Sequence, residues 1–288
     1  MIADIQFISV RGERPLNEDA LIVSEKNGIY GVVDGATSLV PFTDNEGKTG
    51  GYIAAHTIRQ HFESLPGPAD VRAELLVANR RLREEMEKHG IDVARKERLW
   101  GAAAAIVSID RHTVRYAQAG DCMILAVYAD GSVRPLTRPQ LTHVDARTIA
   151  KWEEGRARGL TATEELRAYV YETLKANRQL SNTPDGYGVI NGEPEAEHYI
   201  EYGAINKIRL KHLILLSDGF YVPGRGPDAD DVWRKLAEAI LTFGLGEYAA
   251  MLERFEAEDP DGRRHARLKK SDDKTGIVIT LQPAETAV

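Results

Sequence analysis

Four short acidic stretches lie far apart in this chain, and each of them borders an apolar run. They are Asn17-Glu18-Asp19, Asp34-Gly35, Ser217-Asp218-Gly219 and Asp272-Asp273-Lys274-Thr275. Carboxylates at the ends of buried strands are costly to gather, because like charges repel and burial disfavours each anion. A hard divalent cation stabilises such a cluster, since it prefers oxygen ligands. The sequence therefore predicts a metal site built from residues far apart in the chain.

Composition limits the class of protein. The 288 residues are 43% hydrophobic and 28% charged, which is typical of a soluble globular chain long enough to bury a full core. The net charge of −7 argues against a nucleic-acid partner, because such binders present a basic face. The single cysteine, Cys122, excludes an intramolecular disulfide and a cysteine-rich zinc site.

No targeting segment or membrane anchor is visible in the sequence. The first six residues lack a basic stretch followed by an apolar one, so we expect no signal peptide. No segment approaches the roughly 20 apolar residues that a membrane span needs. We therefore expect a cytoplasmic protein with no membrane partner.

The pattern of elements predicts strands and helices in alternating blocks. Strand-type runs and helical stripes follow one another in the first half, with a hairpin turn at Asn27-Gly28. We expect strands at 5–10, 20–23, 29–33, 102–109, 113–119 and 123–128, and helices at about 47–62 and from 71 to 89. In the second half we expect strands at 213–216 and 277–281, and helices at about 228–242 and 246–257. Few βαβ units occur, so the fold class is α+β, with antiparallel sheets flanked by helices.

The segment from about 138 to 195 has a different character. Residues 143–178 are highly charged and read as two helices broken near Gly155 and Gly159. Thr161 and Glu164 fit a capping box that would open the second helix. Residues 180–192 are rich in Asn, Pro, Asp and Gly, which is typical of an irregular loop. We interpret the whole segment as a subdomain inserted into one domain that covers residues 1–288.

Six motifs in order carry a resemblance to a known family. They are Arg14-Pro15-Leu16-Asn17-Glu18-Asp19, Val33-Asp34-Gly35, Ala119-Gly120-Asp121, Leu136-Thr137, Leu216-Ser217-Asp218-Gly219 and Asp272-Asp273-Lys274-Thr275. Together they resemble the metal-dependent serine/threonine phosphatases of type 2C, the PPM family. The resemblance implies a four-layer αββα sandwich with two Mn²⁺ or Mg²⁺ ions at one end. It also implies a phosphorylated protein as substrate.

The resemblance assigns metal ligands residue by residue. Asp34 would bridge the two ions and Gly35 would add its carbonyl. Asp218 and Asp272 would complete one ion, and Glu18 would bind the other directly or through water. Asp273 stands where the family often has Asn, and a shift of one residue would exchange it with Asp272.

Three further roles follow from the same resemblance. Asp19 would orient metal-bound water, Arg14 would bind the substrate phosphate, and Asp121 with Asp218 would hold a possible third ion. Two cations that share a carboxylate lower the pKa of the water between them, and an arginine fork suits phosphate. The alternative for Arg14 is a solvated charge in a loop. The alternative for Asp121 is a turn at the edge of a strand, without metal.

The general acid stays open at this point. Many eukaryotic members have a histidine near the Asp-Gly motif, where this chain has Ala36-Thr37. His143, at the start of the insert, is the histidine to examine, with a surface position as the alternative. The insert occupies the place of the family's variable flap, beside the cleft. Two other functions remain possible: a non-catalytic phosphopeptide-binding module of the same fold, and a phosphatase of small metabolites.

Overall fold

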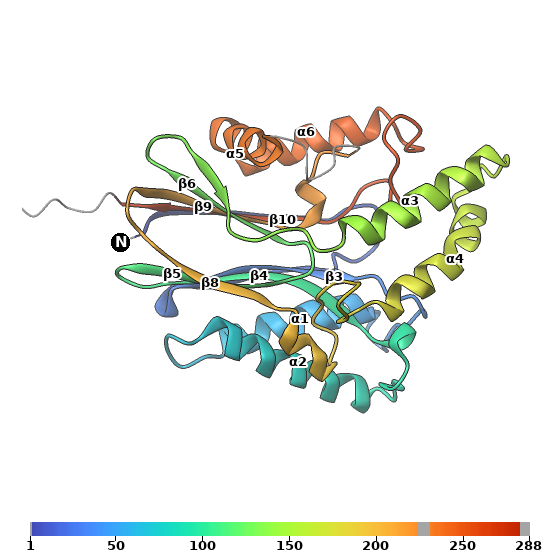
Figure 1. Cartoon of the computed structure of the whole chain (residues 1–288), viewed down its shortest axis with the longest axis horizontal. Helices are drawn as coiled ribbons and strands as arrows, with labels where there is room; N and C mark the ends of the chain where they lie inside the picture. Colours follow the sequence, from blue (N-terminus) through green and yellow to red (C-terminus); the bar gives the residue numbers. More distant parts are fainter. Residues whose placement is uncertain (1, 224–230, 283–288) are drawn as a thin grey trace, which may run out of the picture.

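Two antiparallel sheets face each other in the computed structural model, which describes residues 2–223 and 231–282 (Figure 1). One sheet has the strand order β1 (Ile2–Val10), β10 (Lys274–Leu281), β9 (Leu210–Leu216), β6 (Met123–Tyr128) and β7 (Val133–Pro135). The other has the order β2 (Asp19–Ser24), β3 (Ile29–Ala36), β4 (Gly101–Ile109), β5 (Thr113–Ala119) and β8 (Glu201–Asn206). Each strand expected from an apolar run in the sequence is present.

A pair of helices covers the outer face of each sheet. Helices α1 (Gly50–Glu63) and α2 (Val71–Lys88) pack on the β2–β8 sheet, and α5 (Val232–Phe243) and α6 (Leu245–Ala257) pack on the β1–β7 sheet (Figure 1). The result is the expected α+β fold, a four-layer αββα sandwich. Residues 228–230 of the expected helix 228–242 lie outside the described residues.

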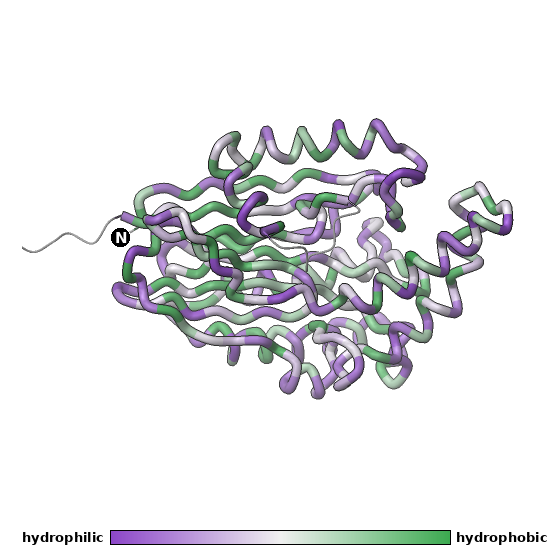
Figure 2. Tube along the Cα trace, turned by 45° about the horizontal axis from the view of Figure 1, so that its top comes forward, coloured by the Kyte–Doolittle hydropathy of each residue, from purple (hydrophilic) through white to green (hydrophobic). Residues whose placement is uncertain are grey.

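Apolar side chains fill three interfaces between these four layers. The middle one lies between the sheets and includes Val32, Ile124, Leu215 and Ile277, all fully buried. Hydrophobic residues accordingly concentrate along the strands (Figure 2). Because β3 and β9 are covered on both faces, their sequences are nearly continuous apolar runs, and any polar residue at their ends stands out.

Capping residues fix where the first two helices begin. The Thr49 hydroxyl accepts a hydrogen bond from the Tyr52 amide, which opens α1. The Asp70 carboxylate accepts from the amides of Arg72 and Ala73, which opens α2. Each bond satisfies a donor that the first helical turn leaves free. In the described part of the chain, no helix combines the length and the apolar character needed to cross a bilayer.

The expected insert contains two helices, α3 (Thr142–Ala157) and α4 (Thr163–Gln179), which extend from one end of the sandwich (Figure 1). Trp152, Leu166 and Val170 form a small core between them. The break near Gly159, with a φ of +92°, is confirmed, but Gly155 does not break the helix, because α3 continues through it to Ala157. The predicted capping box is wrong: α4 begins one residue later, with Ala162 at the N-cap and no side-chain cap.

The segment after α4 is an irregular loop, as expected, and it returns to the sandwich. Ile190 pairs with Ala102 through two backbone hydrogen bonds, so the chain pairs with the start of β4, before the residues of β4 that pair with β5. Tyr187 and Val189 are buried against Val144 of α3. The sequence of the Pro184–Gly188 turn fits either a loop near the active site or a plain surface turn. Pro184 and Asp185 are exposed, as in a surface turn, whereas Tyr187 is buried and packs against α3.

Candidate metal centre

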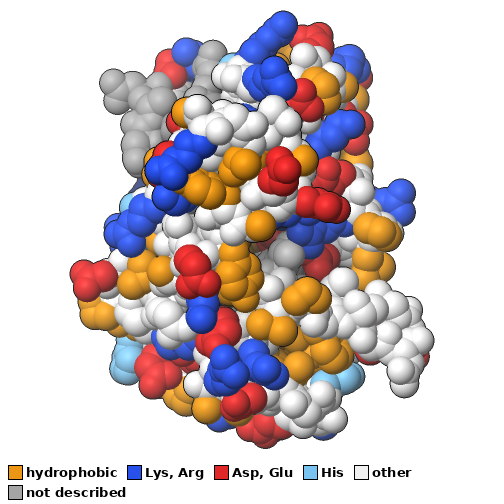
Figure 3. All heavy atoms as spheres, turned by 90° about the vertical axis from the view of Figure 1, so that its right-hand side faces the viewer, with side chains coloured by type: hydrophobic (Ala, Val, Ile, Leu, Met, Phe, Trp, Pro, Cys, Tyr) orange, Lys and Arg blue, Asp and Glu red, His pale blue; other side chains and the backbone are white. Residues whose placement is uncertain are grey.

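The ends of four strands bring the acidic motifs together at the end of the sandwich beside α3 and α4. Asp19 begins β2 and pairs in register with Asp34 near the end of β3. Asp218 follows β9, and Asp121 precedes β6, the strand beside β9. Antiparallel pairing places the end of one strand beside the beginning of the next, which explains why residues 200 positions apart meet. Figure 3 looks onto this end, where acidic and basic side chains lie close together.

Burial and mutual repulsion act on Asp34 and Asp218. Burial is the main cause that raises the pKa of the Asp34 carboxyl well above its usual range, and the neighbouring Asp19 and Asp218 raise it further. Burial and Asp272 likewise raise the pKa of Asp218. The Oδ1 atom of Asp218 is buried without a hydrogen-bond partner. Two carboxyls in this state are costly unless a cation neutralises them.

The Asp19 carboxyl is also buried. Its Oδ2 accepts a hydrogen bond of 2.8 Å from the Ser217 hydroxyl, while its Oδ1 is buried without a partner. Burial raises the pKa of Asp19 to about 8, against the opposing hydrogen bonds of Ser217 and Thr275. Asp19 therefore reaches the cluster from β2 and offers one free oxygen.

The third-ion candidate Asp121 has a neighbour that the sequence did not indicate. Burial and the charge of Asp218 raise the pKa of Asp121 well above its usual range, and Asp145 adds to the effect. Asp145 lies in the first turn of α3, and burial with the Asp218 charge raises its pKa to about 7. In sequence it is one charge on a charged helix, so only the docking of α3 reveals it.

The two neighbouring aspartates of the last motif are engaged differently. Asp273 is buried and accepts one backbone hydrogen bond at each oxygen, from the amides of Gly12 and Glu18, both at 2.7 Å. Asp272 instead faces the cluster, where its charge acts on Asp34 and Asp218. Its oxygens lie 2.7 and 2.6 Å from the Nζ atom of Lys269, a residue that the sequence analysis did not single out.

Glu18 and Arg14 form an ion pair at the rim of the cluster. The Arg14 Nη1 atom lies 3.0 Å from Glu18 Oε2, and Thr37 donates to the same oxygen at 3.3 Å. The Thr49 hydroxyl donates to the other oxygen of Glu18. Arg178, from the end of α4, donates to the Thr37 carbonyl at 2.7 Å and so connects the insert to this rim.

Gly35 is required by the close approach of three backbone segments. Its amide donates to the Glu18 carbonyl at 3.1 Å. A Cβ at this position would lie 2.5 Å from that same carbonyl oxygen, closer than real contacts allow. The glycine therefore lets Glu18, Asp34 and the start of α1 share one corner.

The donor chemistry of this cluster fits divalent metal ions. It gathers carboxylate oxygens, two of them buried without partners, and such oxygens are the ligands that Mg²⁺ and Mn²⁺ prefer. As they stand, the described His, Cys, Asp and Glu side chains form no group of three or more that could hold one ion. Two of the expected ligands instead contact cations of the chain itself: Lys269 pairs with Asp272, and Arg14 pairs with Glu18.

His143 and Cys122 have other surroundings. His143 is exposed, and its Nε2 lies 3.3 Å from the Asp185 carbonyl oxygen. Cys122 is buried, and burial raises the pKa of its thiol well above the usual range, so a thiolate nucleophile is disfavoured there. The phenol of Tyr221 donates to the Asp121 backbone carbonyl.

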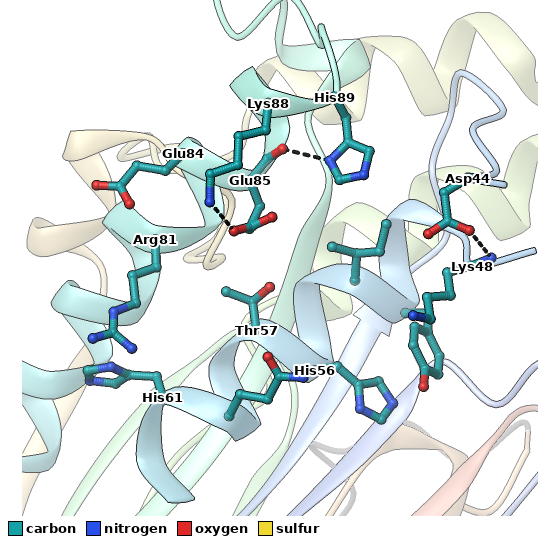
Figure 4. Close-up of a pocket in the computed structure, with 13 residues that line it drawn as sticks. Asp44, Lys48, His56, Thr57, His61, Arg81, Glu84, Glu85, Lys88 and His89 are labelled. Atoms are coloured by element: carbon teal, nitrogen blue, oxygen red, sulfur yellow. Dashed lines mark hydrogen bonds and ion pairs between the residues drawn. The ribbon is translucent and has the colours of Figure 1, made fainter. Parts of the chain in front are cut away.

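A separate cavity of about 480 Å³ lies between α1, α2 and the loop before α1 (Figure 4). None of its lining residues belongs to the acidic cluster. Its walls mix acidic and basic side chains with three histidines, and burial lowers the pKa of His56 to about 4, so this imidazole is neutral at pH 7. Because its walls carry both signs of charge, the cavity favours neither anionic nor cationic ligands. The carboxylate cluster is therefore the stronger candidate for the functional site.

The model of one protein family, described as protein phosphatase 2C, matches residues 11–255. The chain belongs to the protein phosphatase 2C family. It is therefore a metal-dependent serine/threonine protein phosphatase by family, and the resemblance found in the six motifs is confirmed. The match includes Arg14 to Asp218 but ends before Asp272. A comparison with curated proteins finds no match.

Solved structures of bacterial phosphatases share the protein phosphatase 2C fold with this chain. Stp1 from Staphylococcus aureus superposes with a TM-score of 0.58 at 15% identity, over 98% of this chain and 96% of that one. PstP/Ppp from Mycobacterium tuberculosis gives 0.56 at 17% identity, over 98% and 100%. The PstP catalytic domain in complex with two manganese ions gives 0.56 at 16% identity, over 96% and 97%.

Proposed function

We propose that this protein phosphatase 2C member hydrolyses phosphoserine and phosphothreonine in proteins at the carboxylate cluster. The observation that carries the proposal is the convergence of Asp19, Asp34, Asp121 and Asp218 at one end of the sandwich, each with a raised pKa. Such carboxyls are stable as anions only with cations beside them. The PstP structure that holds two manganese ions at 16% identity adds support for Mn²⁺ here, and Mg²⁺ has the same preference for oxygen.

Five residues would hold the two ions in this proposal. Asp34 and the Gly35 carbonyl would serve both ions, Asp218 and Asp272 would serve one of them, and Glu18 would serve the other. When bound, the ions supply a hydroxide nucleophile near neutral pH and neutralise charge on the phosphoryl group. The raised pKa of Asp34 and the free Oδ1 of Asp218 support these assignments. Asp273 acts differently, by anchoring the backbone of Gly12 and Glu18.

One side chain would serve the substrate, one the water, and one a third ion. Arg14 lies at the rim and is 30% exposed at its side chain, so its guanidinium can meet a phosphate from solvent. Asp19, with one free oxygen, would accept a hydrogen bond from the attacking water. Asp121 would contribute to a third ion site with Asp218, and Asp145 supplies a further carboxyl there.

We also propose that residues 1–288 form a single domain and that the segment 138–195 is its flap. The contacts of Tyr187 and Ile190 with the sandwich support a fixed base for this flap, while α3 and α4 extend beyond it. A cytoplasmic location and the absence of nucleic-acid and membrane partners remain predictions, supported by the single buried cysteine and the net charge of −7.

The test is hydrolysis of a chromogenic aryl phosphate and of a phosphothreonine peptide. The wild type is assayed with Mn²⁺, with Mg²⁺ and with excess chelator, beside Asp34→Asn and the matched variant Asp110→Asn. We expect turnover only with metal, a loss of at least about a hundredfold in Asp34→Asn, and no loss in Asp110→Asn, because Asp110 lies in a turn with Thr113 and Arg115.

Three results would point elsewhere. Turnover in chelator, or a fully active Asp34→Asn variant, contradicts the proposal. Two bound metal ions without turnover of either substrate favour a phosphopeptide-binding module. Turnover of the aryl phosphate alone, with small phosphorylated metabolites competing, favours a metabolite phosphatase.

A further inference from the structure

Lys269 places an ammonium group inside the carboxylate cluster. Its Nζ lies 2.7 Å from Oδ1 and 2.6 Å from Oδ2 of Asp272, so it engages both oxygens. Burial by itself lowers the pKa of Lys269, but the charges of Asp272, Asp218 and Asp34 outweigh it and raise the pKa above the usual range. The side chain is 29% exposed, which leaves it one face toward solvent. Lys269 is thus a permanent cation beside three proposed metal ligands.

The segment that carries Lys269 is held by its own hydrogen bonds, although it has no helix or strand. The Asp259 carboxylate accepts from the amides of Arg263, Arg264 and His265, between 2.8 and 3.2 Å. Arg267 pairs with Asp259 at 3.1 Å and donates to the Glu256 carbonyl at 3.0 Å. Four donors on one carboxylate fix the turn that precedes Lys269 and so direct its side chain toward the cluster.

The same segment is joined to the flap helices. Arg156 of α3 donates to the Gly262 carbonyl at 2.7 Å and also bonds the Asp261 carbonyl. Leu268, next to Lys269, packs against the small core of Trp152, Leu166 and Val170 between α3 and α4. The position of Lys269 therefore depends on contacts with the flap as well as on the turn at Asp259.

We propose that Lys269 is a tethered counter-ion that occupies Asp272 in the metal-free protein and competes with divalent cations for that carboxylate. The inference rests on the proposed metal centre and concerns how tightly the centre binds its ions. A carboxylate oxygen has two lone pairs, so geometry alone does not prevent Asp272 from binding Lys269 and a metal ion at the same time. Charge does oppose it, because an ammonium and a divalent cation a few ångströms apart repel each other strongly where water is largely excluded. Metal binding at Asp272 therefore requires Lys269 to withdraw, and the contacts of its segment with the flap resist that movement.

The test is a titration of metal-stripped protein with Mn²⁺, followed by calorimetry and by the electron paramagnetic resonance of free Mn²⁺. Wild type is compared with Lys269→Met, which keeps length and removes charge, and with Lys269→Arg, which keeps the charge. Lys270→Met is the matched control, since Lys270 is the exposed neighbour in the same segment. We expect Lys269→Met to bind at least one Mn²⁺ about tenfold or more tightly, equivalent to about 1.4 kcal/mol. The Arg variant and the Lys270 control stay within about threefold of wild type.

An unchanged or weaker Mn²⁺ affinity in Lys269→Met overturns the proposal. Unchanged affinity would mean that Lys269 does not compete with the metal for Asp272, and weaker affinity would mean that Lys269 helps to orient Asp272. If that variant does not fold, as judged by circular dichroism, Lys269→Gln provides the same comparison with a hydrogen-bonding side chain. The titration needs no substrate, so it is independent of turnover. A protein that hydrolyses phosphate esters but shows no change in affinity refutes only the role of Lys269. Tighter binding without any hydrolysis refutes only the proposed function.

Discussion

The metal-free protein should lose stability as the pH rises from 6.5 to 8, which is the reverse of the usual behaviour of a carboxylate-rich fold. The cause is Asp19, whose pKa is about 8 in the folded protein against 3.8 for the free side chain. Between these two values the folded state holds a proton that the unfolded state has released. The free energy of unfolding therefore falls as pH rises through this range and stops falling above the folded pKa.

The window is chosen so that histidines do not mask the effect. The pKa of His56 is about 4 in the folded protein against 6.5 when free, so its contribution changes in the opposite direction, mostly below pH 6.5. The free imidazole is half protonated at pH 6.5, so the rise in unfolding free energy that remains above this pH is only about 0.4 kcal/mol. From pH 6.5 to 8, Asp19 alone then costs about 2 kcal/mol of unfolding free energy. For a chain of this length the entropy of unfolding is about 0.6 kcal/mol per kelvin, so the melting temperature should fall by about 3 °C.

The assay is thermal unfolding followed by circular dichroism, at pH 6.5, 7.0, 7.5 and 8.0, in excess chelator and again with saturating Mn²⁺. We expect the fall only in chelator, because bound ions hold the carboxylates ionised and remove the cost of deprotonation. Asp19→Asn has no group that titrates at this position, so its melting temperature should fall less over the same pH range. A flat or rising melting temperature in chelator, or an equal fall in Asp19→Asn, would refute the reasoning.

Two other predictions concern the residues that support Asp272. Glu256→Gln should destabilise the protein by about 3 kcal/mol in urea unfolding, because it leaves the buried ammonium of Lys274 without the carboxylate 3.0 Å away. The double variant Glu256→Leu with Lys274→Met should recover most of this loss of stability. Equal losses in the single and the double variant would contradict a charge effect. Asp273→Leu should weaken Mn²⁺ binding by about 10- to 100-fold in calorimetry, because two backbone amides lose their acceptor. Asp273→Asn, which keeps one acceptor, should lose less affinity, and equal losses in the two variants would contradict a role through these hydrogen bonds.

The sandwich could be predicted from the sequence because its strands are covered on both faces. The run from Ile29 to Val33 is fully buried between α1 and the opposite sheet, so every position has to be small or apolar. Antiparallel order also followed, because helices come in pairs and not between successive strands. The carboxylates at these strand ends were conspicuous for the same reason, and their order along the chain pointed to one site.

The flap was harder to predict because fewer of its residues are buried by the sandwich. The first turn of α4 has exposed side chains, so the pattern at Thr161 and Glu164 had no packing to fix its register, and the helix begins one residue later. Tyr187 lies in a stretch whose composition is typical of a surface turn. It is buried because the chain beyond it pairs with β4, and that contact has no local sequence signal.

The cost of gathering carboxylates was predicted from the sequence, but its neutralisation was attributed wholly to metal ions. The structure adds two cations from the chain itself, Arg14 on Glu18 and Lys269 on Asp272. Arg14 lies four residues from its partner, whereas Lys269 comes to the cluster because its segment is held by the turn at Asp259 and by contacts with the flap. A protein that supplies its own counter-ions lowers the penalty of its metal-free state and also weakens its hold on metal. The charge at Lys269 therefore affects both the stability of the metal-free protein and its metal affinity. Removing this charge alone should lower the stability and raise the affinity.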